Sequence, residues 1–439
     1  MSGAAVAASG FLVMLALIAV RMPVGLAMLV AGSLGYIHLT GVPVYLNYIK
    51  STPYHLFANY TLSVIPLFIL MGALAERSGL STALFKAASG VIGHRRGGMA
   101  MAVIGACTAF GAICGSSVAT TATFARAALP ELRRYKYAPA LATGTIAVGG
   151  TLGILIPPSV ILVVYAITTE QNIAKLFQAA FIPGLLAALF YCVVIALVVR
   201  RDPDAGPGHA PVPTAERWKA IGAVWPAIVI AVVVVGGIYG GVFTPTEGAA
   251  VGAVAMLVTA LLQGTLGWQG LKQALLQTAE TSAMIFVILL GAEVFDAFLG
   301  LSQMPEKAAE LVTSFGLPPF GVVALLMLFY ILLGAVMDEL AMILLTLPVF
   351  FPIVMKLDFG MTPDEVGIWF GILVLIVVGI GLTAPPIGLN VFVVSSIARD
   401  VPIMTIYRGV LPFVAADIIR LGLVMAFPAL ALVLVRWLN

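Results

Sequence analysis

Apolar runs of about 17 to 25 residues, separated by short polar connections, follow one another along the whole 439-residue chain. A helix needs about 20 apolar residues to cross roughly 30 Å of hydrocarbon, and the alternating pattern of β-barrel strands is absent. The pattern therefore predicts an all-α polytopic membrane protein. We expect spans at residues 4–20, 24–39, 61–77, 138–168, 177–199, 221–243, 247–263, 280–300, 366–397 and 408–437.

Two of these runs are interrupted by a double proline at the same relative position. One contains Pro157 and Pro158, and the other contains Pro385 and Pro386. Proline cannot donate a backbone hydrogen bond, and no water replaces the lost donor in hydrocarbon. The freed carbonyls must therefore face protein, an ion or a wet cavity. Paired broken helices in two corresponding halves of a chain indicate the binding site of a transporter.

Two further apolar stretches, residues 98–130 and 318–352, have limbs of roughly 15 residues, and we expect re-entrant helical hairpins there. Basic residues flank the first hairpin, as in cytoplasmic loops, whereas the flanks of the second have little basic excess. Hairpins that enter from opposite faces meet near the bilayer midplane, which predicts two inverted-topology repeats of five spans and one hairpin each. The alternative is that the four limbs of these hairpins are ordinary spans, in which the glycines have no special role.

Composition supports this class, because 62% of the residues are hydrophobic and only 9% are charged. The net charge of +3 is spread over loops and gives no indication of nucleic-acid binding. The first apolar run has no basic residue before it, unlike a cleaved signal peptide, so we expect it to remain as a span with the N-terminus outside. Cys107, Cys114 and Cys192 lie in apolar runs without metal spacing and are expected to be buried free thiols.

Signatures of an enzyme are missing from the sequence. The four histidines are scattered, no HExxH motif or nucleophile elbow occurs, and the Walker pattern that would indicate ATP hydrolysis is absent. We therefore expect no catalytic residues, no organic cofactor and no transition-metal site.

Small and hydroxyl-bearing residues mark the tip of the first predicted hairpin, GAICGSSVATTAT. Small residues permit a tight turn, and hydroxyl oxygens together with unwound backbone carbonyls are hard ligands that suit sodium. The alternative is that these residues only mediate close helix packing. The candidates at this tip are Gly115, Ser116, Ser117, Thr120 and Thr121.

Asp338, in the second hairpin, is an intramembrane carboxylate. Such a group costs about 2.5 to 3.5 kcal/mol on insertion scales, and a bound cation would offset that cost. We favour Asp338 as the ion ligand, although Glu339 is adjacent and the sequence does not show which carboxylate faces the ion.

Two other charged pairs lie within predicted spans. Glu293 and Asp296 share one helical face and could form a proton relay or pair with a basic side chain near the interface. Asp417 and Arg420 are three residues apart in the last span and most simply satisfy each other.

The two breaks complete the candidate set, because the exposed main chain of an interrupted helix can cage an ion. Residues just after each break could instead hydrogen-bond freed backbone groups. The candidates are Gly150, Thr151, Pro157, Pro158 and Ser159 at the first break and Gly381, Thr383, Pro385, Pro386 and Asn390 at the second.

The strings GAICGSSVATTATFARAALPEL, GGTLGILIPPSVILVVYAI and TAPPIGLNVFVVSSIA resemble the large membrane (M) subunit of tripartite ATP-independent periplasmic (TRAP) transporters, and the resemblance runs almost end to end. It implies the translocating component of a sodium-coupled carrier of organic acids. It also implies a separate small four-helix Q subunit, a periplasmic binding protein that delivers the substrate, and the bacterial inner membrane. We expect both chain termini on the periplasmic side.

The resemblance further implies an elevator-type carrier related to the divalent-anion symporters, with sodium and substrate held at the hairpin tips and the breaks. By motif, the matching positions are Gly115 to Ser117, Gly150 to Pro158, Asp338, and Thr383 to Pro386. The residues that we expect to bind sodium are Gly115, Ser116, Ser117, Gly150, Thr151, Asp338, Gly381 and Thr383. Glu339 departs from the family pattern, since many relatives carry proline or another uncharged residue there. This departure bears on the tip geometry and on the preference for the coupling ion.

An elevator carrier divides into a static scaffold and a mobile transport domain. We predict scaffold segments at residues 1–60 and 219–279, transport-domain halves at 61–199 and 280–439, and a linker at 200–218. A standalone sodium- or proton-coupled anion symporter would share nearly all these features. A membrane enzyme or assembly scaffold would instead need a polar catalytic constellation or show no response to ions.

Overall fold

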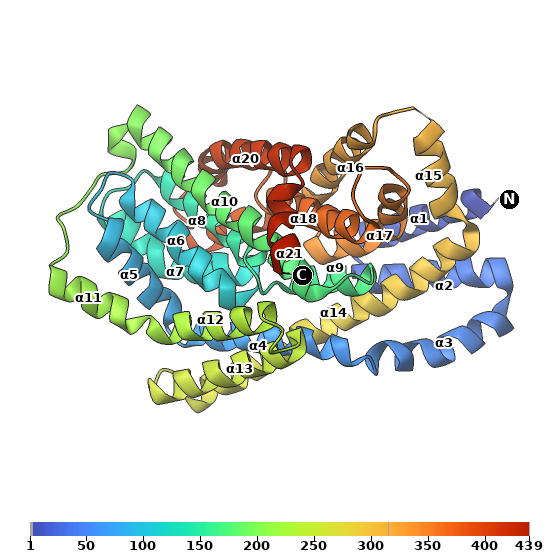
Figure 1. Cartoon of the computed structure of the whole chain (residues 1–439), viewed down its shortest axis with the longest axis horizontal. Coiled ribbons are helices and arrows are strands. Elements are labelled where there is room, and N and C mark those ends of the chain that lie inside the picture. The colour runs from blue at the N-terminus through green and yellow to red at the C-terminus, as the bar shows by residue number, and fades with distance from the viewer. Residues whose placement is uncertain (1–2, 315, 439) are drawn as a thin grey trace.

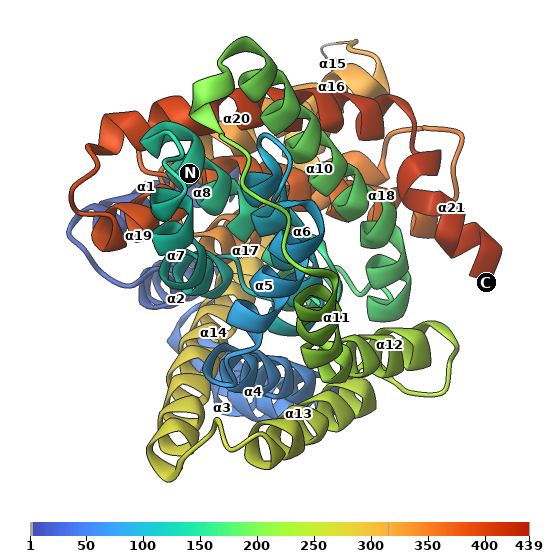
Figure 2. The same cartoon turned by 90° about the vertical axis from the view of Figure 1, so that its left-hand side faces the viewer.

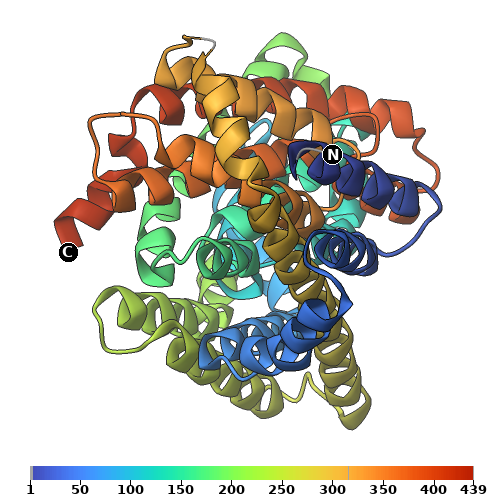
Figure 3. The same cartoon turned by 90° about the vertical axis from the view of Figure 1, so that its right-hand side faces the viewer.

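The computed structural model describes residues 3–314 and 316–438, which are helices joined by turns and contain no strand. The outermost residues of the predicted terminal segments, 1–2 and 439, lie outside the described residues. Figures 1 to 3 show the arrangement from three sides. The all-helical prediction is confirmed.

The helices of the first half contain one hairpin and one broken helix. They are α1 (Gly3–Ala19), α2 (Val24–Thr40), α3 (Val42–Phe57), α4 (Val64–Arg77), α5 (Leu80–Ile92), α6 (Gly98–Cys114), α7 (Ser117–Arg134), α8 (Pro139–Leu155), α9 (Val160–Thr168) and α10 (Ile173–Arg201). Two 3-10 turns, η1 (Tyr60–Ser63) and η2 (Pro203–Ala205), precede α4 and follow α10.

The helices of the second half follow the same order. They are α11 (Thr214–Ala223), α12 (Trp225–Tyr239), α13 (Pro245–Leu262), α14 (Trp268–Ser302), α15 (Met304–Ser314), α16 (Pro319–Gly334), α17 (Glu339–Met355), α18 (Pro363–Gly381), α19 (Leu389–Ile397), α20 (Ile403–Ala426) and α21 (Ala429–Leu438). The hairpins α6/α7 and α16/α17 and the broken helices α8/α9 and α18/α19 occupy matching places in the two series.

Contacts between the halves also match. Helix α2 of the first half packs along α14 of the second, and α13 of the second half packs along α4 of the first. Helices α3, α4, α12 and α13 lie together along the lower side of the molecule in Figures 1 and 2, below the two hairpins. In Figure 3 the dark blue helix α1 faces the viewer, right of centre, and the red helix α21 lies at the left edge.

The broken helices lie at the centre of the packing. Every residue of α8 from Leu141 to Leu155 is buried, and so is every residue of α18 from Val366 to Gly381. A helix that is apolar on all sides is stable only when it is covered on all sides. The first interruption therefore lies in the interior, whereas Pro385 and Pro386 of the second are exposed although the helix that precedes them is buried.

The predicted spans agree with the helices in most places. Six helices among the described residues have the length and apolar character to cross a membrane, or up to eight if two bent pairs count as spans. The predicted break near Pro157 separates α8 from α9, which are bent by 44°. Helices α1 and α2, predicted as spans, have 17 residues each and fall just below that length.

Three boundaries predicted from the sequence are wrong. The last predicted span, 408–437, is two helices, because the chain leaves helical geometry at Phe427 before Pro428. The predicted span 221–243 is divided between α11 and α12, which are bent by 42°, and α12 ends at Tyr239. The predicted span 280–300 begins too late, because Trp268 to Ser302 form one 35-residue helix, α14.

Candidate functional site: two hairpin tips at one cavity

The tip of the first hairpin is a two-residue turn. Helix α6 ends at Gly115, which adopts the left-handed conformation with φ +63°, a region that favours glycine. Ser116 then caps α7, because its side-chain oxygen accepts a hydrogen bond from the amide of Ala119 at 3.4 Å. A Cβ atom on Gly115 would lie 2.9 Å from the carbonyl oxygen of Pro158, so the tip rests directly against the first break.

The first break is held by hydrogen bonds on both sides. Ser159 caps α9 by accepting from the amide of Leu162 at 3.5 Å. On the preceding helix, the Thr151 hydroxyl lies 2.7 Å from the carbonyl oxygen of Val148 and 3.1 Å from the hydroxyl of Tyr191. Both peptide bonds between the paired prolines, at the first and at the second break, are cis.

The second hairpin contacts the second break in the same manner. The carbonyl oxygen of Ala335, at the tip, accepts a hydrogen bond from the amide of Ile387 at 3.3 Å. Gly334 and Gly381 bring the backbones of α16 and α18 into close contact. Asp338 caps α17, since its Oδ1 accepts from the amides of Leu340 and Ala341 at 3.0 and 3.2 Å.

Asn390 joins the two halves of the chain. Its side-chain amide donates to the hydroxyl of Ser117 at 2.8 Å and to the carbonyl oxygen of Ala147 at 3.0 Å. The Oδ1 atom of Asn390 is buried and has no hydrogen-bond partner among residues 3–314 and 316–438. The second break is therefore tied to the start of α7 and to the middle of α8.

A cavity of about 450 Å³ lies between the two tips. Gly115 and Ser116 line it from the first hairpin, and Asp338 and Glu339 line it from the second. Helices α4, α9 and α14 complete the wall, with mostly apolar side chains. A cavity of this size accommodates a small organic molecule. It lies between two hairpin tips, each of which contacts an interrupted helix.

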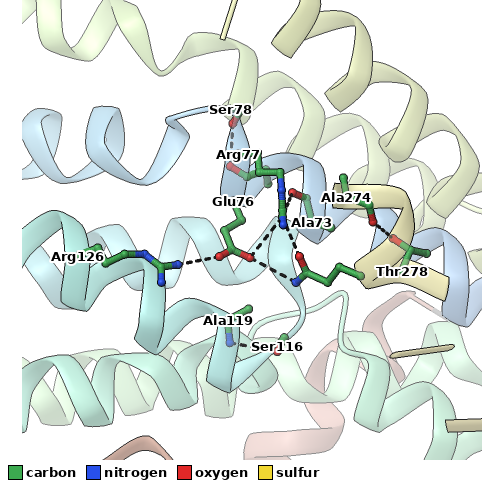
Figure 4. Close-up of polar contacts among 11 residues, drawn as sticks. Ala73, Glu76, Arg77, Ser78, Ser116, Ala119, Arg126, Ala274 and Thr278 are labelled. Carbon is green, nitrogen blue, oxygen red and sulfur yellow. Dashed lines mark hydrogen bonds and ion pairs between the residues drawn. The ribbon is translucent and has the colours of Figure 1, made fainter. Parts of the chain in front are cut away.

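A polar network lies at the wall of this cavity, as Figure 4 shows. The guanidinium of Arg126 on α7 lies 2.8 Å from Oε1 of Glu76 on α4. Gln277 on α14 donates to Oε2 of Glu76 at 3.4 Å and accepts from Arg77 at 2.7 Å. The Arg126 side chain is 58% exposed, so the ion pair contributes at most about 1 kcal/mol and mainly orients these groups.

The predicted candidates divide into two sets in the structure. Gly115, Ser116 and Asp338 line the cavity. The others support the tips and breaks from behind, mostly as buried residues, except that Pro385 and Pro386 are exposed. These supporting residues are Ser117, Thr120, Thr121, Gly150, Thr151, Pro157, Pro158, Ser159, Gly381, Thr383, Pro385, Pro386 and Asn390. Whether any candidate binds sodium or substrate stays a prediction.

Several of the residues around the cavity could not be recognised from the sequence as parts of a site. Glu76 and Gln277 lie in apolar helices about 200 residues apart, and they meet only because α4 packs on α14. Arg126 was visible only as one of the basic residues that flank the first hairpin. An acidic residue at the end of an apolar helix, as Glu76 is, was the one available signal.

The other charged pairs differ in their surroundings. Asp417 and Arg420 form the expected ion pair, with a distance of 2.9 Å and side chains 1% and 0% exposed. Glu293 and Asp296 are exposed on α14, and no basic side chain in the described residues forms an ion pair with them. Of the two alternatives for this pair, an ion pair with a basic neighbour is wrong for the described residues, and the proton relay stays a prediction.

The sequence also led to expectations about the cysteines and about metal sites. Cys107 and Cys114 are buried and Cys192 is partly buried, and all three are free thiols as predicted. Residues 3–314 and 316–438 contain no group of three or more His, Cys, Asp or Glu side chains suited to a metal ion.

Comparisons with known proteins match nearly the whole chain. The sequence model of the family described as "Tripartite ATP-independent periplasmic transporter, DctM component" matches residues 11–430. The chain is 37% identical to the C4-dicarboxylate TRAP transporter large permease protein DctM of Pseudomonas aeruginosa, with 87% of each chain covered. It is 31% identical to the sialic acid TRAP transporter large permease protein SiaM of Vibrio cholerae, with 86% of each covered.

Two further matches concern architecture. The isethionate TRAP transporter permease protein DctMQ of Oleidesulfovibrio alaskensis is 29% identical, over 88% of this chain and 60% of that one. The crystal structure of the Alcanivorax borkumensis YdaH transporter, described as having an unusual topology, aligns with a TM-score of 0.65 at 14% identity and covers 89% of this chain and 90% of that one. That likeness shows the fold alone.

The named relatives are permease subunits of transporters, and the family match extends over both hairpins, both breaks and the cavity between them. The chain is thus a multi-pass transport protein and not an enzyme. It belongs to the DctM family, the large permease subunits of tripartite ATP-independent periplasmic transporters.

Proposed function

We propose that this chain is the translocating subunit of a sodium-coupled importer of an organic acid. The observation that carries the proposal is that each hairpin tip rests against the break of its own half while both tips line one cavity. Broken helices supply carbonyl oxygens, which suit sodium, and half-helix N-termini, which suit the carboxylate of a substrate.

The proposed substrate class comes from the relatives. Their names specify C4-dicarboxylates, sialic acid and isethionate, all of which are small organic anions. The cavity of about 450 Å³ is compatible with molecules of this size. A C4-dicarboxylate is the first substrate to test, because the large permease of Pseudomonas aeruginosa named for it is 37% identical to this chain.

Two protein partners are proposed. A periplasmic binding protein would deliver the substrate, and a small four-helix membrane subunit would pack on the scaffold. One relative is named DctMQ and is much longer than the region that matches this chain, which supports a small subunit joined to the large one in that protein. In this proposal the complex lies in the inner membrane, with both termini of the chain on the periplasmic side.

The proposed mechanism is an elevator movement. The hairpins and broken helices would move as a transport domain against the scaffold segments at residues 1–60 and 219–279. Sodium would order the tips before the anion is held. Because about 2.3 kcal/mol is available per charge per 100 mV, two or more sodium ions would draw a substrate anion inward against its own charge.

Reconstitution in proteoliposomes tests this function. The chain, its small subunit and its binding protein are combined, and uptake of labelled succinate, malate and sialic acid is measured with an inward gradient of sodium or of potassium. We expect uptake that requires sodium and increases with an inside-negative potential. Equal uptake in the potassium gradient would contradict sodium coupling. Equal uptake without the binding protein would instead favour the standalone symporter.

A further inference from the structure

Two adjacent carboxylates begin α17, and their side chains have different surroundings. Asp338 is the capping residue, and its Oδ1 accepts hydrogen bonds from the amides of Leu340 and Ala341. Glu339 is the first residue of the helix and lines the cavity together with Gly115 and Ser116. Capping of α17 therefore explains why a carboxylate stands at Asp338, but it does not explain the carboxylate of Glu339.

The carboxylate of Glu339 is not satisfied by the protein. Its Oε2 atom is buried and has no hydrogen-bond partner in the described residues. A buried polar oxygen without a partner is costly, and an unpaired buried charge costs more. Since nearly all buried polar groups in folded proteins are satisfied, this oxygen is available to a hydrogen-bond donor or a cation that enters the cavity.

The charged side chains around the cavity indicate the sign of the charge that Glu339 would bind. Three acidic side chains, Glu76, Asp338 and Glu339, and one basic side chain, Arg126, line the cavity, which gives a formal charge of −2. Arg126 is already paired with Glu76 at 2.8 Å. No basic side chain among the lining residues therefore remains to neutralise Glu339, so a cation bound in the cavity would offset part of the negative charge that an organic anion meets there.

We propose that Glu339 is a ligand of a coupling cation held in the cavity between the two tips. The bound ion is a hard monovalent cation. The carboxylate of Glu339 and the hydroxyl and carbonyl oxygens of the first tip are suitable oxygen ligands for such an ion. Asp338 shapes the second tip as the helix cap, and Glu339 supplies the charge. This inference rests on the proposed cation-coupled transport, and it assigns the carboxylate that the sequence left open.

The matched variants for a test are E339Q, E339D and E280Q. The purified full-length chain is heated in detergent at increasing sodium chloride, with choline chloride to keep the ionic strength constant. A cation that binds the native state raises the unfolding temperature, and weaker binding moves this effect to higher cation concentrations. Glu280 is exposed on α14 and does not line the cavity, so E280Q is the control for loss of one carboxylate.

We expect E339Q to raise the sodium concentration for half-maximal stabilisation at least tenfold, E339D to give a smaller increase, and E280Q to give none. D338A removes the cap and should lower the unfolding temperature equally with and without sodium. An unchanged sodium midpoint in E339Q, or in E339D if E339Q does not fold, would overturn the assignment of Glu339 while leaving sodium coupling intact. Absence of sodium stabilisation in the unmodified chain would overturn the coupling itself and this inference with it.

Discussion

At the scale of single residues, the buried pair of Asp417 and Arg420 is the clearest case of a charge that the fold must neutralise. Tyr191 donates to Oδ2 of Asp417 at 2.7 Å, and Arg420 donates to the carbonyl oxygen of Pro183 at 3.2 Å. Tyr191 also contacts the hydroxyl of Thr151, next to the first break. The pair thus supports the packing of α10 and α20 behind that break.

Removing one member of this pair should be strongly destabilising. The D417N substitution leaves the guanidinium of Arg420 buried without a counter-charge, so we expect a loss of about 3–5 kcal/mol in the free energy of unfolding. The double variant D417N/R420M removes both charges and should recover most of that loss. Thermal unfolding of the purified chain measures both, with D400N on the exposed surface as the control. A double variant as unstable as D417N would contradict this reading.

The type of a residue indicates its role less well than its position in a helix does. Asp338 was chosen from the sequence as the ion ligand because it is a carboxylate in an apolar stretch, and the structure shows that it caps α17. A cap can be recognised only when the start of the helix is known, and the sequence did not locate that start between two adjacent acidic residues. Glu339 was identified from the sequence as a departure from the family pattern. In the structure its Oε2 atom is buried without a hydrogen-bond partner among the described residues.

At the scale of helices, the tips and breaks act as connected units. The first tip contacts Pro158 of the first break, and the second tip accepts a hydrogen bond from the second break. A change at a tip should therefore be transmitted to the interrupted helix behind it. Asn390 extends this connection from the second break to Ser117 at the first tip.

The first tip provides a direct test of this coupling. Alanine at Gly115 is disfavoured in the left-handed region by about 1–2 kcal/mol, and its Cβ would lie 2.9 Å from the carbonyl oxygen of Pro158. We expect G115A to lose at least that amount of stability and to slow uptake by the reconstituted transporter. In G105A the new Cβ meets no atom within 4 Å, so this control on α6 should be neutral or slightly stabilised. Equal behaviour of the two variants would show that the tip tolerates displacement.

The helices were predictable from the sequence where a single physical signal dominates. Length and apolar character located most spans, and the double prolines located both breaks. The sequence did not reveal that Phe427 separates α20 from α21 or that α14 continues through its amphipathic start, because packing decides whether a helix continues through an ambiguous turn. The short helices α5 and α15, which precede the hairpins, also had no distinct signal.

At the scale of the whole molecule, the two halves meet at one cavity. Residues from α4, α7 and α9 in the first half and from α14 and α17 in the second line it. The cavity could not be predicted from the sequence, because its wall depends on contacts between segments about 200 residues apart, such as that of Glu76 with Gln277. What the sequence did show was that two similar interruptions occur, and that pattern is typical of a central binding site.

The most direct test of this account is whether the shared cavity opens to both sides of the membrane. Cys107, Cys114 and Cys192 are replaced by alanine, a single cysteine is placed at Ser116, and the complete transporter is reconstituted in oriented vesicles. A membrane-impermeant thiol reagent is then added to one side at a time, with the cysteine-free chain as the control. We predict labelling from both sides, with proportions that change with sodium and substrate. Labelling from one side only under every condition would contradict alternating access at this cavity.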